Sequence, residues 1–246
     1  MMASLIRLDL ALEARKLLPS RARARDAILR GTVTVNGEIA QKPNQMVLPT
    51  DAIALDDPAA RYVSRAALKL IAGLDAGAIE VEGKTCLDVG ASTGGFTQVL
   101  MERGAKLIYA VDVGHDQLHK RFRNSTKVVV LERQNARELS EEQIPDPIDL
   151  LVCDVSFVSV VKVLAAPLRL CRAGADAVVL IKPQFEVGRD NIGGGGIVSD
   201  PAAIAPAIEA VLAFMAGEGF VHRLSLPSPI AGGDGNIETV AVFRRS

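Results

Sequence analysis

The sequence predicts an α/β protein: a small N-terminal α+β domain, then a larger domain built on a doubly wound, mostly parallel sheet with an antiparallel edge strand. Two patterns lead to this prediction. Helical spacing followed by short alternating strands extends to about residue 55, and apolar strands alternate with helices from about residue 61. A chain of 246 residues is long enough for one large and one small domain.

Patterns in the first 60 residues support the prediction of a small N-terminal domain. Residues 5–18 and 20–30 predict two short helices, the second with Ser20 as its N-cap. Residues 32–37 alternate like a strand that ends in an Asn-Gly hairpin turn, and a last short strand is expected near 52–55. A polar, proline-containing stretch follows and marks a linker. We therefore predict a first domain at 1–58, a linker at 59–64 and a second domain at 65–246.

Strands and helices alternate through the second domain. A helix is expected from Pro201 to about Met215, with Asp200 as its N-cap. The last two strands, 220–227 and 236–243, are joined by a short connection, which predicts a hairpin with an antiparallel strand at one edge. Residues 185–197 are too rich in glycine to pack as an element, so we expect a loop there, either a mobile lid or a plain flexible connection. Earlier strands are predicted from residue 85 and at 107–112, 127–131, 148–154 and 177–182.

The composition, with 49% hydrophobic and 23% charged residues, is ordinary for a soluble globular protein. No apolar run approaches the roughly 18 residues that span a bilayer. Arg7 and Asp9 interrupt the first apolar stretch, unlike a signal-peptide core, so we expect a cytoplasmic protein with no membrane partner. Cys86, Cys153 and Cys171 lie far apart in apolar patterns, which predicts neither a disulfide framework nor a metal site.

A glycine-rich turn after the strand at residue 85 indicates a nucleotide-like cofactor. Glycine permits positive φ angles and close approach of a ligand, and the following helix offers unpaired N–H donors. The turn reads Gly90-x-Ser92-x-Gly94-Gly95, which is neither the Gly-x-Gly-x-x-Gly of dinucleotide folds nor a P-loop, so NAD and ATP are disfavoured. Asp112 ends the next strand, about twenty residues later, where ribose hydroxyls are usually held. An ordinary tight turn is the alternative.

Four charged residues are expected near the carboxyl edge of the sheet: Lys69, Asp154, Lys182 and Glu238. A lysine and a carboxylate that end buried strands are costly unless they are paired. A lysine beside a second lysine in a partly desolvated cleft can accept a proton, because burial and like-charge repulsion disfavour its protonated form. A structural ion-pair network is the alternative.

Basic residues concentrate in the small domain, although the net charge of the chain is −1. The first 50 residues hold eight Lys or Arg and four Asp or Glu, and Arg21 and Arg25 share one helix face. This clustering predicts contacts with nucleic-acid phosphates, and a solvated helix face is the alternative. His115 and His119 are spaced like a metal pair, but without a zinc motif we expect exposed helix residues and no metal.

Motifs spread over nearly the whole chain carry a resemblance to a known family. In the small domain they are Arg7-Leu-Asp9, Ser20-Arg21, Gly31-x-Val-x-Val-Asn-Gly37 and Lys42-Pro43. In the large domain they are Ser64-Arg65-x-x-x-Lys69-Leu70, Asp88-Val-Gly-Ala-Ser-Thr-Gly-Gly-Phe96, Asp154-x-Ser-Phe157, Lys182-Pro-Gln-Phe-Glu-Val-Gly188 and Gly235-Asn-x-Glu238. The chain thus resembles the TlyA family, ribosomal RNA 2′-O-methyltransferases often labelled hemolysins, which join an S4-type RNA-binding domain to an FtsJ-like domain.

The resemblance implies a Rossmann-like class I methyltransferase domain that uses S-adenosyl-L-methionine and acts on ribosomal RNA or ribosomal subunits, at a cytidine 2′-hydroxyl. It implies a catalytic tetrad of Lys69, Asp154, Lys182 and Glu238. Implied cofactor-binding residues are Asp88, Gly90, Ala91, Ser92, Thr93, Gly94, Gly95, Phe96, Asp112, Val113, Asn135, Ala136 and Asp154. Implied RNA-binding residues are Arg7, Ser20, Arg21, Arg23, Arg25, Arg30, Lys42 and Arg65. The chain departs from the family at residue 115, where His stands in place of an expected Tyr.

In the resulting hypothesis, Lys182 accepts the proton of a ribose 2′-hydroxyl while its oxygen attacks the activated methyl group in line. Asp154 and Glu238 orient this amine and the substrate, and Lys69 favours the neutral amine or stabilises the developing oxyanion. The alternatives are a membrane-active, hemolysin-like protein and a non-catalytic RNA-binding protein. The first lacks support, because no strongly amphipathic basic helix or spanning segment is present.

Overall fold

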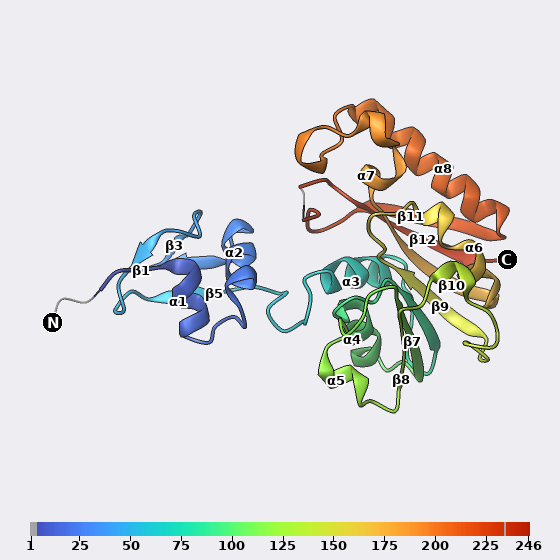
Figure 1. Ribbon diagram of the computed structural model, residues 1–246, viewed down its shortest axis with the longest axis horizontal. Coiled ribbons are helices and arrows are strands. Elements are labelled where there is room, and N and C mark those ends of the chain that lie inside the picture. The colour runs from blue at the N-terminus through green and yellow to red at the C-terminus, as the bar shows by residue number, and fades with distance from the viewer. Residues whose placement is uncertain (1–3, 234) are drawn as a thin grey trace. The chain divides into compact units, whose positions relative to one another are not determined.

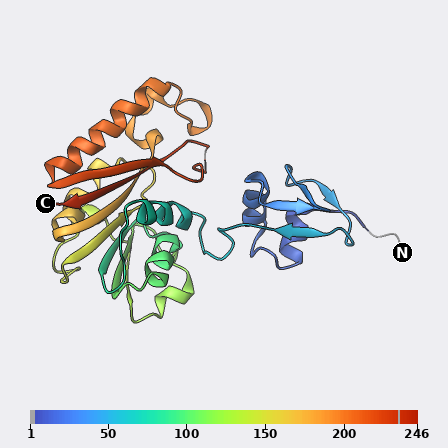
Figure 2. The same ribbon diagram turned by 180° about the vertical axis from the view of Figure 1, so that it is seen from behind.

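The computed structural model describes residues 4–233 and 235–246. Its internal contacts divide the chain into two compact units, with the boundary between Arg61 and Tyr62. Each unit has its own hydrophobic core and is described by itself (Figures 1 and 2). Among the described residues, no helix is both long and apolar enough to cross a bilayer.

The N-terminal unit packs two helices against short antiparallel strands (Figure 1). Strand β2 lies between β3 and β5 in one sheet, and β1 pairs with β4 in another. Leu8 and Leu12 of α1, Ile28 of α2 and Val33 of β2 are buried together in its core. The elements are β1 (Ile6–Arg7), α1 (Leu8–Ala14), α2 (Arg21–Leu29), β2 (Val33–Val35), β3 (Glu38–Ile39), β4 (Met46–Val47) and β5 (Ile53–Leu55).

The predicted helix over 5–18 is wrong at both ends. Ile6 and Arg7 form β1 and pair with β4, so α1 begins only at Leu8. After α1, Lys16 adopts a left-handed φ of 58°, which no helix can continue through. The second helix is predicted correctly, and Ser20 is its N-cap as expected. The Ser20 hydroxyl accepts a hydrogen bond, at 3.3 Å, from a backbone N–H in the first turn of α2.

Asp9 is a buried carboxylate that joins the first turns of α1 and α2. It accepts hydrogen bonds from the Arg7 guanidinium at 2.9 and 3.0 Å and from Nε of Arg21 at 2.9 Å. The hydrogen bonds from Arg7 are the largest influence, and together with those from Arg21 they outweigh burial and lower the pKa of Asp9 to about 2. Two of the arginines expected to contact RNA therefore also hold this unit together.

The C-terminal unit is built on a seven-stranded sheet in the order β11-β12-β10-β9-β6-β7-β8. Strands β6 to β10 are parallel, whereas β12 runs antiparallel to β10 and to the edge strand β11, which confirms the predicted hairpin. One residue of the hairpin connection, 234, lies outside the described residues. The strands are β6 (Thr85–Val89), β7 (Leu107–Asp112), β8 (Val128–Glu132), β9 (Ile148–Cys153), β10 (Cys171–Ile181), β11 (Phe220–Pro227) and β12 (Thr239–Arg245).

Helices cover both faces of this sheet, with α3 and α4 on one side and α8 on the other (Figures 1 and 2). Alternate strand residues supply the two cores: Val178 and Val240 pack with α3 and α4, whereas Val179 and Phe243 pack with α6 and α8. The helices are α3 (Ala67–Ala76), α4 (Gly95–Glu102), α5 (Lys120–Arg123), α6 (Ala165–Arg169), α7 (Pro183–Glu186) and α8 (Ile204–Gly217), with 3₁₀ turns at Ala136–Glu138, Val160–Lys162, Arg189–Asn191, Gly194–Gly196 and Pro201–Ala203.

The glycine-rich segment 185–197 contains more structure than its composition predicts. It includes the end of α7 and two 3₁₀ turns, and Ile192 bridges Val198. The buried side chain of Asn236 accepts from the backbone N–H of Val198 at 3.0 Å and donates to the carbonyl of Gly196 at 2.9 Å. The expectation that glycine prevents any element here is wrong, because a side chain distant in the sequence satisfies the backbone.

We expect Asp9→Asn to loosen the N-terminal unit. Above pH 4 the substitution should lower the opening free energy of α1 and α2 by about 1–2 kcal/mol, since two half-exposed guanidinium groups lose a charged acceptor. Because folding lowers the pKa of Asp9, its stabilisation is present above the unfolded pKa and is lost as the pH falls from about 4 to 2. Amide hydrogen exchange of α1 and α2 measures this, with the exposed Glu13→Gln as control. Equal protection in wild type and Asp9→Asn at pH 6 would contradict the assignment.

Candidate active site

Gly90 brings the end of β6 against the backbone that follows β9. Its φ is +86°, and a Cβ built on it would lie 2.9 Å from the carbonyl oxygen of Asp154. A side chain here would meet both steric and conformational penalties. The turn then continues to Gly94, whose φ of +97° leads into α4. The glycines identified in the sequence therefore allow two strand ends to touch.

A cavity of about 600 Å³ opens at the carboxyl ends of β6, β7, β8 and β9. This is the switch point of the sheet, since the chain runs from β6 outward to β8 and then crosses to β9 on the other side. Asp112 braces its rim, because its carboxylate accepts from the backbone N–H groups of Ser92 at 2.8 Å and Gly114 at 2.7 Å. The size and place suit a nucleoside-type ligand.

A second cavity of about 140 Å³ shares a wall with the first. Gly90, Ser92, Asp154 and Ser156 line both cavities, and Lys182 lines the small one. A ligand in the large cavity can therefore present one end to whatever enters the small cavity.

Most predicted cofactor residues line these cavities. The large one is lined by Gly90, Ser92, Asp112, Val113, Asn135, Ala136 and Asp154, and the small one adds Ala91, Thr93, Gly95 and Phe96. Asp88 and Gly94 line neither. Gln117, Arg133, Gln134 and Arg137 also line the large cavity but are not among the predicted residues, and their signal is only that they follow strand ends. Ser156 lines both cavities and belongs to the motif Asp154-x-Ser-Phe157, which predicted no role for it.

Asp88 is fully buried at the end of β6. Its Oδ2 accepts from the hydroxyl of Thr97 in the first turn of α4, at 2.6 Å. Burial is the largest influence and raises the pKa of Asp88 to about 7, and the nearby charge of Asp154 acts in the same direction. Asp88 thus contacts α4 rather than the cavity.

The structure arranges the four predicted catalytic residues as two ion pairs. Nζ of Lys182 lies 2.7 Å from Oδ1 of Asp154, and Nζ of Lys69 lies 2.5 Å from Oε2 of Glu238. Lys182 and Glu238 are 6% and 2% exposed, so both charges depend on their partners. The register pairs Ile181 of β10 with Thr239 of β12, which places Lys182 and Glu238 at one sheet edge.

Lys69 approaches this edge from α3, which packs against β10 and β12. A Cβ at Gly73 would lie 2.7 Å from Cγ1 of Val178 and 2.8 Å from Cγ1 of Val240, so α3 sits on the sheet without an intervening side chain. The charge of Lys69 is balanced by Glu238, and the predicted influence of Lys69 on the Lys182 amine or on a developing oxyanion stays a prediction.

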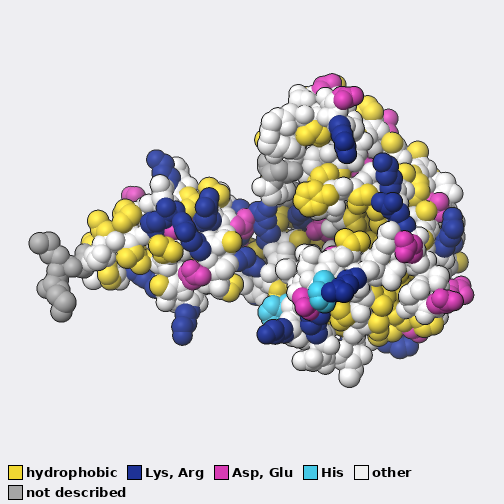
Figure 3. All heavy atoms as spheres, in the orientation of Figure 1, with side chains coloured by type: hydrophobic (Ala, Val, Ile, Leu, Met, Phe, Trp, Pro, Cys, Tyr) yellow, Lys and Arg dark blue, Asp and Glu magenta, His cyan; other side chains and the backbone are white. Residues whose placement is uncertain are grey.

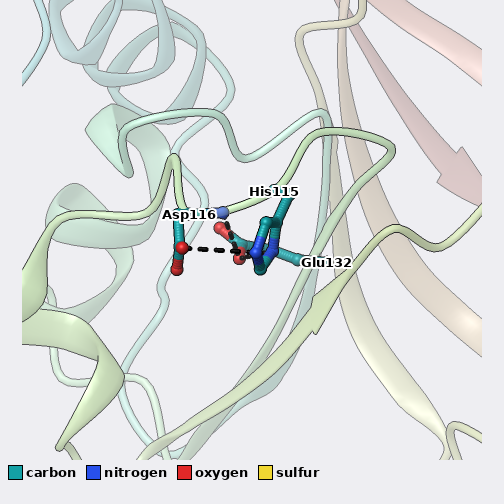
Figure 4. A group of neighbouring side chains, drawn as sticks. All are labelled: His115, Asp116 and Glu132. Carbon is teal, nitrogen blue, oxygen red and sulfur yellow. Dashed lines mark hydrogen bonds and ion pairs between the residues drawn. The ribbon is translucent and has the colours of Figure 1, made fainter.

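A group of possible metal ligands, His115, Asp116 and Glu132, lies beside the site (Figure 4). Glu132 accepts from the backbone N–H groups of residues 116, 117 and 118, and Arg123 lies 2.8 Å from Glu132 and 3.4 Å from Asp116. Burial alone would raise the pKa of Glu132, but these hydrogen bonds lower it to about 2. Because the Arg123 guanidinium already balances the charge of both carboxylates, we interpret these residues as stabilising the loop after β7 rather than binding a metal.

Lys and Arg side chains gather on the visible face of the N-terminal unit (Figure 3). Their contacts differ. Arg30 is held by Asp26 and Asp57 at 2.9 and 2.7 Å, and Arg23 donates to a backbone carbonyl at 2.8 Å, whereas Arg25 and Lys42 are exposed.

The sequence profile of FtsJ-like methyltransferases matches residues 62–245, and that of S4 domains matches residues 6–53. The chain is also 46% identical, over 239 residues, to the 16S/23S rRNA (cytidine-2′-O)-methyltransferase TlyA of Mycobacterium tuberculosis, covering 96% of this chain and 89% of that protein. The chain belongs to the TlyA family. Hemolysin A of Brachyspira hyodysenteriae is 39% identical, with 97% and 99% covered, so relatives in this family carry both kinds of name.

Solved structures agree with membership of the TlyA family. A hemolysin-named protein from Streptococcus thermophilus superimposes with a TM-score of 0.77 at 36% identity, covering 100% of this chain and 90% of that one. A S-adenosylmethionine-dependent methyltransferase from Listeria monocytogenes, with a TM-score of 0.57 at 13% identity, shares the fold of the C-terminal unit.

We expect Gly90→Ala to weaken binding of S-adenosylmethionine at least about tenfold, equivalent to roughly 1.4 kcal/mol, because its Cβ would displace the backbone of Asp154. Gly83→Ala is the matched control: its φ of +74° imposes similar strain, of about 1–2 kcal/mol, but a Cβ there meets no atom within 4 Å. Calorimetric titration measures both affinities. Equal affinities in the two variants would show that strain alone, and not the contact with Asp154, matters.

Proposed function

We propose that this protein transfers a methyl group from S-adenosyl-L-methionine to a cytidine 2′-hydroxyl of ribosomal RNA. The observation that carries the proposal is the Lys182–Asp154 pair, which lies where a small cavity meets the large cavity at the strand ends. Methyltransferase family membership supports the reaction, and the names of the relatives support the substrate. A ribosomal substrate implies work in the cytoplasm.

The large cavity fits the proposed cofactor. Gly90 lets two backbone segments of its wall pack together, because a Cβ there would lie 2.9 Å from the carbonyl oxygen of Asp154, and Asp112 and Asn135 offer oxygens at neighbouring strand ends for ribose hydroxyls. When bound, the cofactor supplies a methyl group already activated by its sulfonium. The chain therefore needs to align two centres and exclude water rather than create a reactive group.

Lys182 is the residue proposed to handle the ribose proton. Its amine lies in the small cavity, within reach of a hydroxyl that enters there, and Asp154 fixes it from one side. Glu238 directly precedes β12, beside the end of β10, and its carboxylate neutralises Lys69, the second lysine of the site. We therefore assign Lys69 and Glu238 to supporting the site and Lys182 and Asp154 to contact with substrate.

The N-terminal unit is proposed to bind RNA through its exposed cations. S4 domains and a basic face suit phosphate contacts, which position an enzyme without reading bases. Arg25 and Lys42 are better placed for this than Arg30, whose guanidinium is shared by two carboxylates.

We expect Lys182→Met to lower methyl transfer to ribosomal RNA by about 10²–10⁴-fold while cofactor binding persists, since the change removes only the amine. Lys84→Met is the control, because Lys84 forms a similar pair with Asp176, at 2.8 Å, outside both cavities. Radiolabelled methyl transfer measures both. Near-normal transfer by Lys182→Met, or transfer to RNA whose target ribose is 2′-deoxy, would refute the proposed role.

We expect the double variant Arg25→Ala/Lys42→Ala to bind ribosomal RNA less tightly. Each phosphate contact releases counterions from the RNA on binding, so the loss of a contact reduces the number released. The magnitude of the slope of log affinity against log salt should therefore fall by about 0.7–0.9 per residue. The control Lys106→Ala/Lys127→Ala removes two exposed cations before β7 and β8, at the opposite end of the sheet from the cavities. Filter binding at several salt concentrations separates the two, and equal slopes would exclude Arg25 and Lys42 from the RNA interface.

A further inference from the structure

The Ser156 hydroxyl lies 2.7 Å from Nζ of Lys182 and accepts a hydrogen bond from it. The same amine is 2.7 Å from Oδ1 of Asp154. The hydroxyl therefore takes one N–H direction of a protonated lysine, and the carboxylate balances the charge of the amine as an ion pair. We propose that Ser156 is a positioning residue whose hydrogen bond, together with the ion pair to Asp154, holds the Lys182 amine toward the small cavity; this inference rests on the proposed function.

A lysine amine needs such a second acceptor because its four-carbon side chain is flexible. Ordering a lysine side chain costs up to about 2 kcal/mol of rotamer entropy. With the ion pair to Asp154 alone the amine could rotate, whereas the added hydrogen bond to Ser156 restricts its orientation. Ser156 lines both cavities and is itself exposed, so its oxygen reaches the buried amine from the side on which substrate would enter.

The loop that carries Ser156 is attached to α7 a few residues further along the chain. Glu186, in α7, accepts from the hydroxyl of Ser159 at 2.6 Å and from the N–H of Val160 at 2.8 Å. These bonds fasten the loop after β9 to the helix that begins directly after Lys182.

Backbone strain at the next residue points the same way. Phe157 has a φ of +65°, a left-handed conformation that costs an L-residue about 1–2 kcal/mol. Its ring lies 5.5 Å from that of Phe185, also in α7. A strained residue persists only where its surroundings fix it, so the position of the Ser156 hydroxyl is preorganised.

Ser156→Ala tests the proposal in the full chain. We expect kcat for methyl transfer to RNA to fall about 10- to 100-fold, because small misplacement of a catalytic group has effects of this size. KM for RNA and Kd for S-adenosylmethionine should stay within about twofold, since the hydroxyl that is removed accepts its hydrogen bond from the Lys182 amine, and residue 156, which lines the large cavity, keeps its backbone. Ser156→Thr keeps a hydroxyl and should restore most of kcat. Ser225→Ala, which removes a hydroxyl paired at 2.8 Å on β11 outside both cavities, should leave kcat unchanged.

Three results would overturn the role of Ser156: wild-type kcat in Ser156→Ala, loss of cofactor affinity that accounts for the lower rate, or failure of Ser156→Thr to recover activity. The first means that the hydroxyl is dispensable, the second that it serves the large cavity, and the third that the space it fills matters rather than its oxygen. Failure of the proposed function is distinct, because wild-type protein would then transfer no methyl group to RNA.

Discussion

The close approach of Gly90 to the backbone of Asp154 is the constraint on which the site depends. Because β6 and β9 are neighbours in the sheet, the turns that follow them must share limited space, and a glycine with a positive φ resolves this. Their contact places the wall of the large cavity directly beside the carboxylate that pairs with Lys182. The cavity proposed for the cofactor and the lysine proposed to accept the proton therefore share this part of the backbone.

Much of the C-terminal unit could be predicted because its strands are buried on both faces and read as apolar runs, with polar residues at their carboxyl ends. The helix over 5–18 failed because pairing of Ile6–Arg7 with Met46–Val47 is non-local and leaves no periodic signal. The charged residues of the site were identifiable individually. Their pairing was not, because which carboxylate Lys69 reaches depends on the distance between α3 and the sheet.

The N-terminal unit shows why a count of arginines overstates an RNA interface. Asp9 and Asp26 are acidic residues that a count of net charge subtracts, yet Asp9 pairs with Arg7 and Arg21, and Asp26 pairs with Arg30. A guanidinium held by a carboxylate is positioned but partly neutralised, whereas an exposed one keeps its full attraction for phosphate. The distribution of partners, more than the net charge, therefore decides which cations keep their full attraction for a phosphate.

The bare surface of α3 at Gly73 has a consequence for the electrostatics of the site. Lys69 lies one helical turn before Gly73, so both face the sheet. The spacing between helix and sheet sets how far the Lys69 chain must extend to reach its carboxylate partner. A methyl group at residue 73 would push α3 away from the sheet. Lys69 would then no longer reach Glu238, and two buried charges would lose their partners. Neutrality at this edge is thus maintained by a residue that has no side chain.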